Sequence, residues 1–113
     1  MSKELIIEFM NKLYIPDPPH ALLLIGVSSA ANWLVTLNLV ERTSVFAFIE
    51  NELSKEGDLP IKELLIKVLQ QVGGNDSLKL IDKVITEGES IHGKYLILDA
   101  KNAKNKLVAN RKI

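Results

Sequence analysis

The stretch ESIHGKYLILD, residues 89–99, decides the fold prediction for this chain. Its second half, KYLILD (94–99), combines tyrosine, leucine and isoleucine in a short run that is typical of a β-strand. The next stretch, AKNAKNK (100–106), predicts a turn, and KLVAN (106–110) then pairs back antiparallel. The end of the chain therefore predicts a β-hairpin.

Two apolar runs earlier in the chain predict buried central strands. They are ALLLIGV (21–27) and VFAFI (45–49), and short continuous apolar runs of this kind suit strands that are covered on both faces. A third stretch, SLKLIDKVI (77–85), fits a strand by alternation or a helix by its i, i+3, i+7 spacing. We favour the strand for this third stretch.

Helical spacing of apolar residues predicts helices elsewhere. The first covers residues 3–14, where Ser2 can provide the cap and the prolines of IPDPPH (15–20) end the helix. The second covers residues 30–42 and is expected to break at residues 43–44.

The third predicted helix covers residues 61–72. Pro60 suits its first turn, and the glycines at 73–74 suit its end. Helices that alternate with strands imply right-handed parallel crossovers. The whole chain, residues 1–113, is thus predicted to be a single α/β domain with a mixed, mostly parallel sheet sandwiched by helices and a C-terminal β-hairpin.

Composition narrows the class of protein. Apolar residues make up 47% of the chain, which predicts a packed globular fold, and there is no cysteine, which excludes disulfides and thiolate metal sites. The N-terminal residues do not look like a signal peptide, and the longest apolar run is too short to span a bilayer. We therefore expect a cytoplasmic protein without a membrane segment.

Charge is balanced overall but unevenly placed. Residues 100–113 carry five basic groups and no acid, so the other 99 residues hold 9 basic and 14 acidic groups. A basic tail on a mildly acidic body can meet phosphates, and the candidate contacts for nucleic acid or phosphate are Lys101, Lys104 and Lys106. The alternative is a solvated, lysine-rich terminal hairpin.

The pattern H-x-K-x4-D, formed by His92, Lys94 and Asp99, is the candidate catalytic motif. Residues two apart on a strand face the same way, so His92 and Lys94 would project together, while Asp99 would fix the strand end or the turn. A neutral imidazole can attack phosphorus, and an ammonium can neutralise charge on the non-bridging oxygens. The alternative is a strand-edge histidine with no chemical task.

The segment IHGKYLILD (91–99) resembles the H-x-K-x4-D signature of the phospholipase D superfamily, and the predicted order of elements over residues 4–113 is similar to that of the family. The family signature usually continues to G-S-x-N, where this chain reads LVAN (107–110). Asn110 matches the asparagine, but leucine and valine replace the glycine and the serine.

The resemblance implies His92 as nucleophile, Lys94 as phosphate ligand, and supporting roles for Asp99 and Asn110. Family enzymes use two such histidines and no metal. The resemblance therefore implies a homodimer that brings two copies of His92 together, with no metal or other cofactor.

Two function classes follow from these observations, with a weaker third. The first is a phospholipase D-like phosphodiesterase or nuclease, either active or degenerate, with a His–Lys site at a dimer interface. The second is a non-catalytic α/β module that binds nucleic acid or a protein partner. The third is a nucleotide-binding protein that uses a strand-to-helix turn at residues 26–29. The acidic stretch at residues 50–58 is expected to be a solvated loop.

Overall fold

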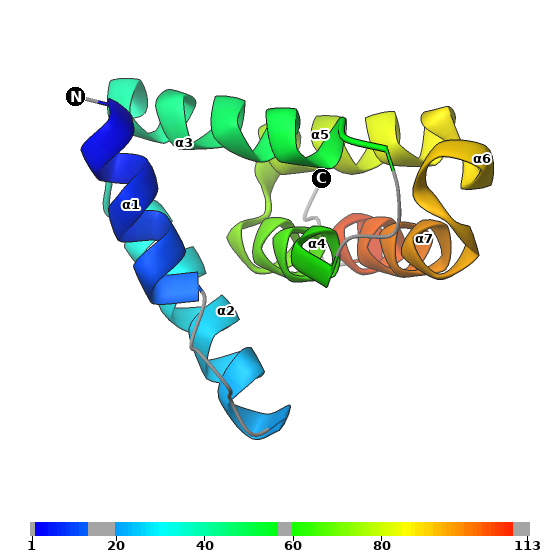
Figure 1. Ribbon diagram of the computed structural model, residues 1–113, viewed down its shortest axis with the longest axis horizontal. Coiled ribbons are helices and arrows are strands. Elements are labelled where there is room, and N and C mark those ends of the chain that lie inside the picture. The colour runs from blue at the N-terminus through cyan, green and yellow to red at the C-terminus, as the bar shows by residue number, and fades with distance from the viewer. Residues whose placement is uncertain (1, 14–19, 57–59, 110–113) are drawn as a thin grey trace.

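All regular structure in the described part of the chain is α-helical. The structure is a computed structural model that describes residues 2–13, 20–56 and 60–109. Figure 1 shows the arrangement of its helices, which are α1 (Ser2–Leu13), α2 (His20–Leu34), α3 (Leu39–Leu53), α4 (Pro60–Val72), α5 (Gly74–Glu87), α6 (Glu89–His92) and α7 (Lys94–Ala109). Because these ranges contain no strand, the predicted α/β fold with its mixed sheet is wrong.

The helices pack around one apolar core. Helices α1 and α2 cross on one side of the molecule, and α4 connects them to the rest by packing against α2, α5 and α7 (Figure 1). Helix α3 packs against α1 and α4, and the short α6 joins α5 to α7. The largest fully buried apolar side chains are Phe9, Leu13, Val27, Leu34, Ile49, Leu65, Ile66, Leu69, Ile81 and Leu96.

The predicted C-terminal hairpin is instead the continuous helix α7. Its buried residues are Leu96, Ile97, Ala100 and Ala103, at positions i, i+1, i+4 and i+7. This helical period continues through the stretch 100–106, which was predicted to be a turn, where alanine and lysine are strong helix formers. The apolar run of the predicted strand is therefore the first part of a helical stripe.

The two predicted central strands also lie within helices, for the same reason. Residues 21–27 belong to α2, whose apolar period continues through Ala30, Ala31 and Leu34, all buried. Residues 45–49 belong to α3, whose buried residues are Val45, Ile49 and Leu53, at positions i, i+4 and i+8.

Helix α3 begins at Leu39, inside the predicted second helix, because Asn38 caps it. The Asn38 side chain accepts a hydrogen bond from the Glu41 backbone N–H at 2.8 Å, and the Glu41 side chain accepts one from the Asn38 N–H at 3.2 Å. This reciprocal capping box starts a helix at a position where the second predicted helix was expected to continue. The predicted break at residues 43–44 is wrong, because both hydroxyls donate to carbonyls one turn earlier within α3.

The stretch 77–85, for which the strand was favoured, lies in α5. Its buried residues are Ser77, Ile81 and Val84, at i, i+4 and i+7. The helical alternative was therefore the correct one.

Two predicted helices are confirmed, as α1 and α4. Pro60 is the first residue of α4, and Gly73 ends that helix with a positive φ of 70° while its N–H donates to the Leu69 carbonyl at 2.9 Å. Helix α1 begins at Ser2 itself, so Ser2 is not a preceding cap. The proline-rich stop predicted for residues 15–20 lies outside the described residues, apart from His20, which begins α2.

The predicted strand-to-helix turn at residues 26–29 is instead the middle of α2. Gly26 is buried where α2 crosses α1, and a Cβ atom placed on it would lie 2.5 Å from the Leu13 carbonyl oxygen. The glycine therefore allows two helix backbones to approach closely.

Candidate functional site

The predicted pair His92 and Lys94 lies at the junction of α6 and α7, not on a strand. His92 ends α6 and is 0% exposed, whereas Lys94 begins α7 and is exposed. Gly93 separates them with φ 84° and ψ 155°, a conformation that glycine adopts readily. The structure does not bring the two side chains to one surface, because the His92 ring is buried and Lys94 is exposed.

His92 is the centre of a buried polar chain. Its Nδ1 lies 3.1 Å from the Nζ of Lys62, and its Nε2 lies 2.8 Å from Oε1 of Glu87. Lys62 is also 0% exposed and donates to the backbone carbonyl of Lys55. These contacts link α4, α5, α6 and the segment after α3.

The contacts assign the proton on the His92 ring. A lysine ammonium has three donors and no acceptor, so the Nδ1 atom of His92 accepts from Lys62 and the ring proton sits on Nε2. The Nε2–H group then donates to Glu87. Both ring nitrogens of the buried His92 therefore have partners, and this chain of contacts stabilises the packing of four segments.

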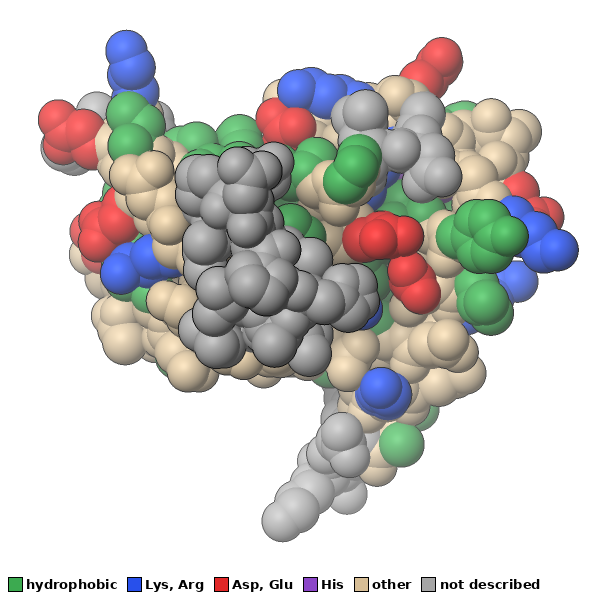
Figure 2. Space-filling view, turned by 60° about the horizontal axis from the view of Figure 1, so that its bottom comes forward, with side chains coloured by type: hydrophobic (Ala, Val, Ile, Leu, Met, Phe, Trp, Pro, Cys, Tyr) green, Lys and Arg blue, Asp and Glu red, His purple; other side chains and the backbone are tan. Residues whose placement is uncertain are grey.

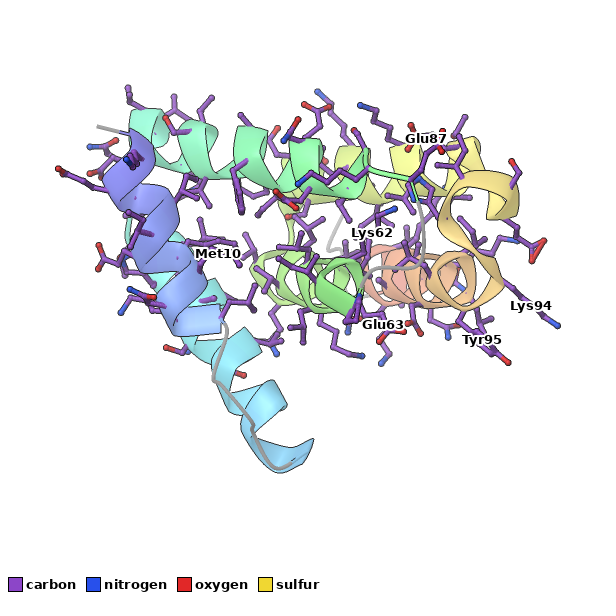
Figure 3. All side chains as sticks on the ribbon, in the orientation of Figure 1. Met10, Lys62, Glu63, Glu87, Lys94 and Tyr95 are labelled. Atoms are coloured by element: carbon purple, nitrogen blue, oxygen red, sulfur yellow. The ribbon has the colours of Figure 1, made fainter. Side chains whose placement is uncertain are left out.

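The sequence prediction missed Lys62 and Glu87. Figure 3 shows both side chains at the end of the molecule where α4 and α5 approach α6. A usable signal existed for Lys62, because it precedes Leu65, Ile66 and Leu69 at spacings of three, four and seven residues on the buried face of α4. A lysine within an apolar stripe has to find buried partners.

The three lysines predicted to contact phosphate all lie on α7. Lys101 and Lys106 are exposed, while Lys104 pairs with Asp82 on α5 at 2.8 Å. Asp99 is half-buried on the same helix, and Asn110 lies outside the described residues. Lys94 adds a further exposed cation at the first position of α7.

Aromatic and apolar side chains lie among these lysines. Tyr95 and Leu98 are 69% and 53% exposed, and they lie near Lys94 and Lys101 on the outer side of α7. Figure 3 shows Lys94 and Tyr95 projecting outward from the first turn, and Figure 2 shows basic and hydrophobic side chains adjacent at this end of the molecule. We call Lys94, Tyr95, Leu98, Lys101 and Lys106 the α7 outer face.

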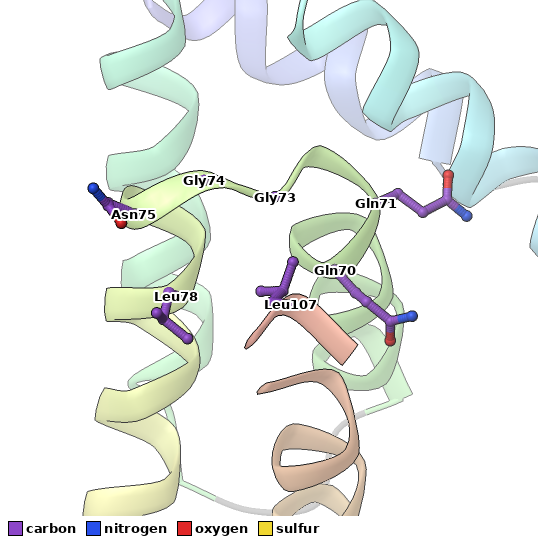
Figure 4. A pocket seen from close by; sticks show the side chains of 7 residues that line it. All are labelled: Gln70, Gln71, Gly73, Gly74, Asn75, Leu78 and Leu107. Atoms are coloured by element: carbon purple, nitrogen blue, oxygen red, sulfur yellow. The ribbon is translucent and has the colours of Figure 1, made fainter. Parts of the chain in front are cut away.

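Two surface hollows lie away from the α7 outer face. One, of 310 Å³, surrounds the connection between α4 and α5 and is drawn in Figure 4. A second, of 370 Å³, lies between α3 and α5, and we call it the α3–α5 groove. Its lining consists of Leu39, Arg42, Thr43, Phe46, Ala47, Glu50, Asp76, Lys79 and Leu80.

The described residues also bear on metal binding, on the acidic stretch 50–58 and on membrane segments. Within residues 2–13, 20–56 and 60–109, no group of three or more histidine or acidic side chains could hold a metal ion. The acidic stretch 50–58 is only partly a loop, because its first four residues form the last turn of α3. No helix in the described part of the chain is long and apolar enough to cross a membrane.

In comparisons with known proteins, no family model, no curated protein and no solved structure matches the chain.

Proposed function

We propose that the protein is a non-catalytic helical module that binds single-stranded nucleic acid through the α7 outer face. The observation that carries the proposal is the set of exposed lysines around an exposed tyrosine on one side of α7. Lysines provide the non-specific attraction to phosphates, and an exposed aromatic ring provides a platform on which an unpaired base stacks.

The position of Lys94 supports a role other than helix stability. It occupies the first position of α7, whose first turn contains no acidic residue. A cation at the positive end of a helix dipole is unfavourable by about 0.3–1 kcal/mol. The Lys94 ammonium and the helix dipole, however, together produce a positive potential that favours an anion at this end of the helix.

The lysines of the outer face are available for a ligand. Among the described residues, Lys94, Lys101 and Lys106 form no ion pair, in contrast to Lys104 and its partner Asp82. The acid-rich body repels phosphates, which favours approach to α7 over approach to the other faces.

Fluorescence anisotropy with a labelled oligothymidylate tests the proposal. We expect a slope of about −2 when the logarithm of the binding constant is plotted against the logarithm of the salt concentration. Each of the three lysines contacts one phosphate, and each phosphate contact on a single strand contributes about −0.7. Changing Lys94, Lys101 and Lys106 to glutamine should abolish both the binding and the salt dependence. The matched control changes Lys3, Lys12 and Lys67, on α1 and α4, to glutamine and should leave the affinity unchanged within about twofold. Equal losses in the two triple variants would contradict a site on α7.

The role of Tyr95 is tested separately. Replacing Tyr95 with alanine should weaken binding by about tenfold with an unchanged salt slope, because base stacking contributes about 1–3 kcal/mol. The control replaces Tyr95 with phenylalanine, which keeps an aromatic ring and should leave the affinity unchanged within about twofold. An unchanged affinity in the tyrosine variant would remove the stacking part of the proposal.

The phosphodiesterase hypothesis stays a prediction that the same samples can test. It requires metal-independent cleavage of a phosphodiester that is lost in His92→Ala. The burial of His92 between Lys62 and Glu87 supports the non-catalytic proposal, because the ring nitrogens already have partners. Cleavage of the labelled oligonucleotide that persists with a chelator and disappears in a folded His92→Ala variant would favour the enzyme.

A further inference from the structure

Helix α3 carries apolar side chains beyond its buried side. Its inner side buries Val45, Ile49 and Leu53 in the core. The adjoining outer side presents Leu39, 75% exposed, and lines the α3–α5 groove with Phe46, which is partly buried against the core. An exposed apolar stripe that continues a buried one is normally covered as well, because its burial gains free energy.

The charged residues on this outer side follow a symmetric order. Arg42, Phe46 and Glu50 lie four residues apart, so they share one stripe of the helix, with the positive charge before the aromatic ring and the negative charge after it. All three line the α3–α5 groove. Arg42 and Glu50 are about 12 Å apart along the axis, from eight residues at 1.5 Å each.

We propose that this surface binds a second copy of the same chain. The two α3 helices lie antiparallel across a two-fold axis at Phe46. In that arrangement position 42 of each copy faces position 50 of the other, so two Arg42–Glu50 pairs flank the two Phe46 rings. A two-fold interface requires a surface that is complementary to itself, and this order of residues meets that requirement.

The environment of Arg42 provides an independent argument. Its Nη2 atom donates to the carbonyls of Val35 and Leu37, both at 3.2 Å, and so holds the side chain in place after α2. Because the guanidinium is already fixed, an ion pair with Glu50 of a second copy costs little additional side-chain entropy.

Charge balance also favours a second copy over a strongly charged partner. The groove contains two basic residues, Arg42 and Lys79, and two acidic residues, Glu50 and Asp76. Glu50 already contacts Lys83 at 3.2 Å, but both side chains are about half exposed, at 48% and 46%, so this pair is weak and can exchange. The dimer does not depend on nucleic-acid binding, because it uses a different face from α7.

Light scattering coupled to size-exclusion chromatography tests the dimer. The expected mass is twice the chain mass of 12.6 kDa. A wild-type chain that elutes as a monomer at tens of micromolar would overturn the proposal.

Charge exchange tests the register. The Arg42→Glu and Glu50→Arg variants should each be monomeric, since each places like charges opposite one another. An equimolar mixture of the two should recover the dimer mass, because the glutamates of one chain then face the arginines of the other. Dimers that persist in both single variants would overturn this arrangement.

If circular dichroism shows that Arg42→Glu does not fold, the double exchange Arg42→Glu/Glu50→Arg is compared with Glu50→Arg alone. A dimer in the double exchange and a monomer in Glu50→Arg support the register, and any other pair of masses overturns it.

A single introduced thiol tests the position of the axis, because the chain contains no cysteine. Phe46 lies on the proposed axis, so position 46 of one copy faces position 46 of the other. Mild oxidation of Phe46→Cys should give a disulfide-linked dimer, whereas the matched variant Leu98→Cys on α7 should not. Equal cross-linking of the two variants would contradict the proposed axis.

Discussion

The buried polar chain and the α7 outer face both include residues of the stretch 89–99, yet they use polar side chains in opposite ways. His92, inside the molecule, is held by Lys62 and Glu87, so its nitrogens are not available to a ligand. Lys94 and Tyr95, only two and three residues later, project into solvent. The comparison teaches that burial, more than residue type, separates a polar side chain that holds the fold together from one that a ligand can reach.

The largest expected effect comes from removing the interior lysine. Lys62→Ala should lower the free energy of unfolding by about 2–5 kcal/mol, because it leaves a cavity in the interior and buried acceptors without a donor. Chemical denaturation measures this loss. The control Lys67→Ala, an exposed position on the same helix, should change stability by less than about 0.5 kcal/mol. Similar losses of unfolding free energy in the two variants would show that interior and surface lysines contribute equally to stability.

The next effect concerns the close approach of α1 and α2. Gly26→Ala should lower the free energy of unfolding by about 1–3 kcal/mol, because the added methyl overlaps the Leu13 carbonyl and the two helices have to separate. Thermal denaturation reports the change. Alanine is otherwise the better helix former, so a more stable variant would show that the crossing is looser than described. Ser29→Ala, at an exposed position of α2, is the matched control.

The smallest effect belongs to a lysine pair on the surface. A double-mutant cycle on Lys104 and Asp82 should give a coupling energy of about 0.2–1 kcal/mol, because both side chains are almost half exposed and water screens their attraction. The coupling should shrink with added salt. A salt-independent coupling as large as the loss in Lys62→Ala would show that exposure does not determine the contribution of these lysines.

The sequence predicted α1 and α4 because their signals are local and agree with one another. In α4, Pro60 at the start, Gly73 after the end and a regular apolar stripe all indicate the same element. The strand predictions for residues 21–27, 45–49 and 94–99 failed because each depended on an apolar run of only five to seven residues. Over so short a window, a continuous apolar run fits a buried strand and one side of a buried helix equally well.

The candidate site shows a similar division. The three predicted phosphate-contact lysines do lie on one element, but their placement on α7 follows from a helix that was predicted to be a hairpin. The role of His92 could not be read from its motif, because its partners Lys62 and Glu87 come from other helices. Spacing along the chain carries no information about side chains that meet only after packing.

By itself, the sequence determined the helix-forming stretches with clear caps and stops, the lack of cysteine chemistry and the concentration of positive charge near the C-terminus. These properties depend on neighbours along the chain or on composition alone. Only the tertiary structure decided that the run 94–99 is helical, that His92 faces inward and that Lys94 faces outward. The physical reason is that segments distant in sequence bury one another's apolar side chains. Each segment therefore adopts the conformation whose apolar side the other segments can cover.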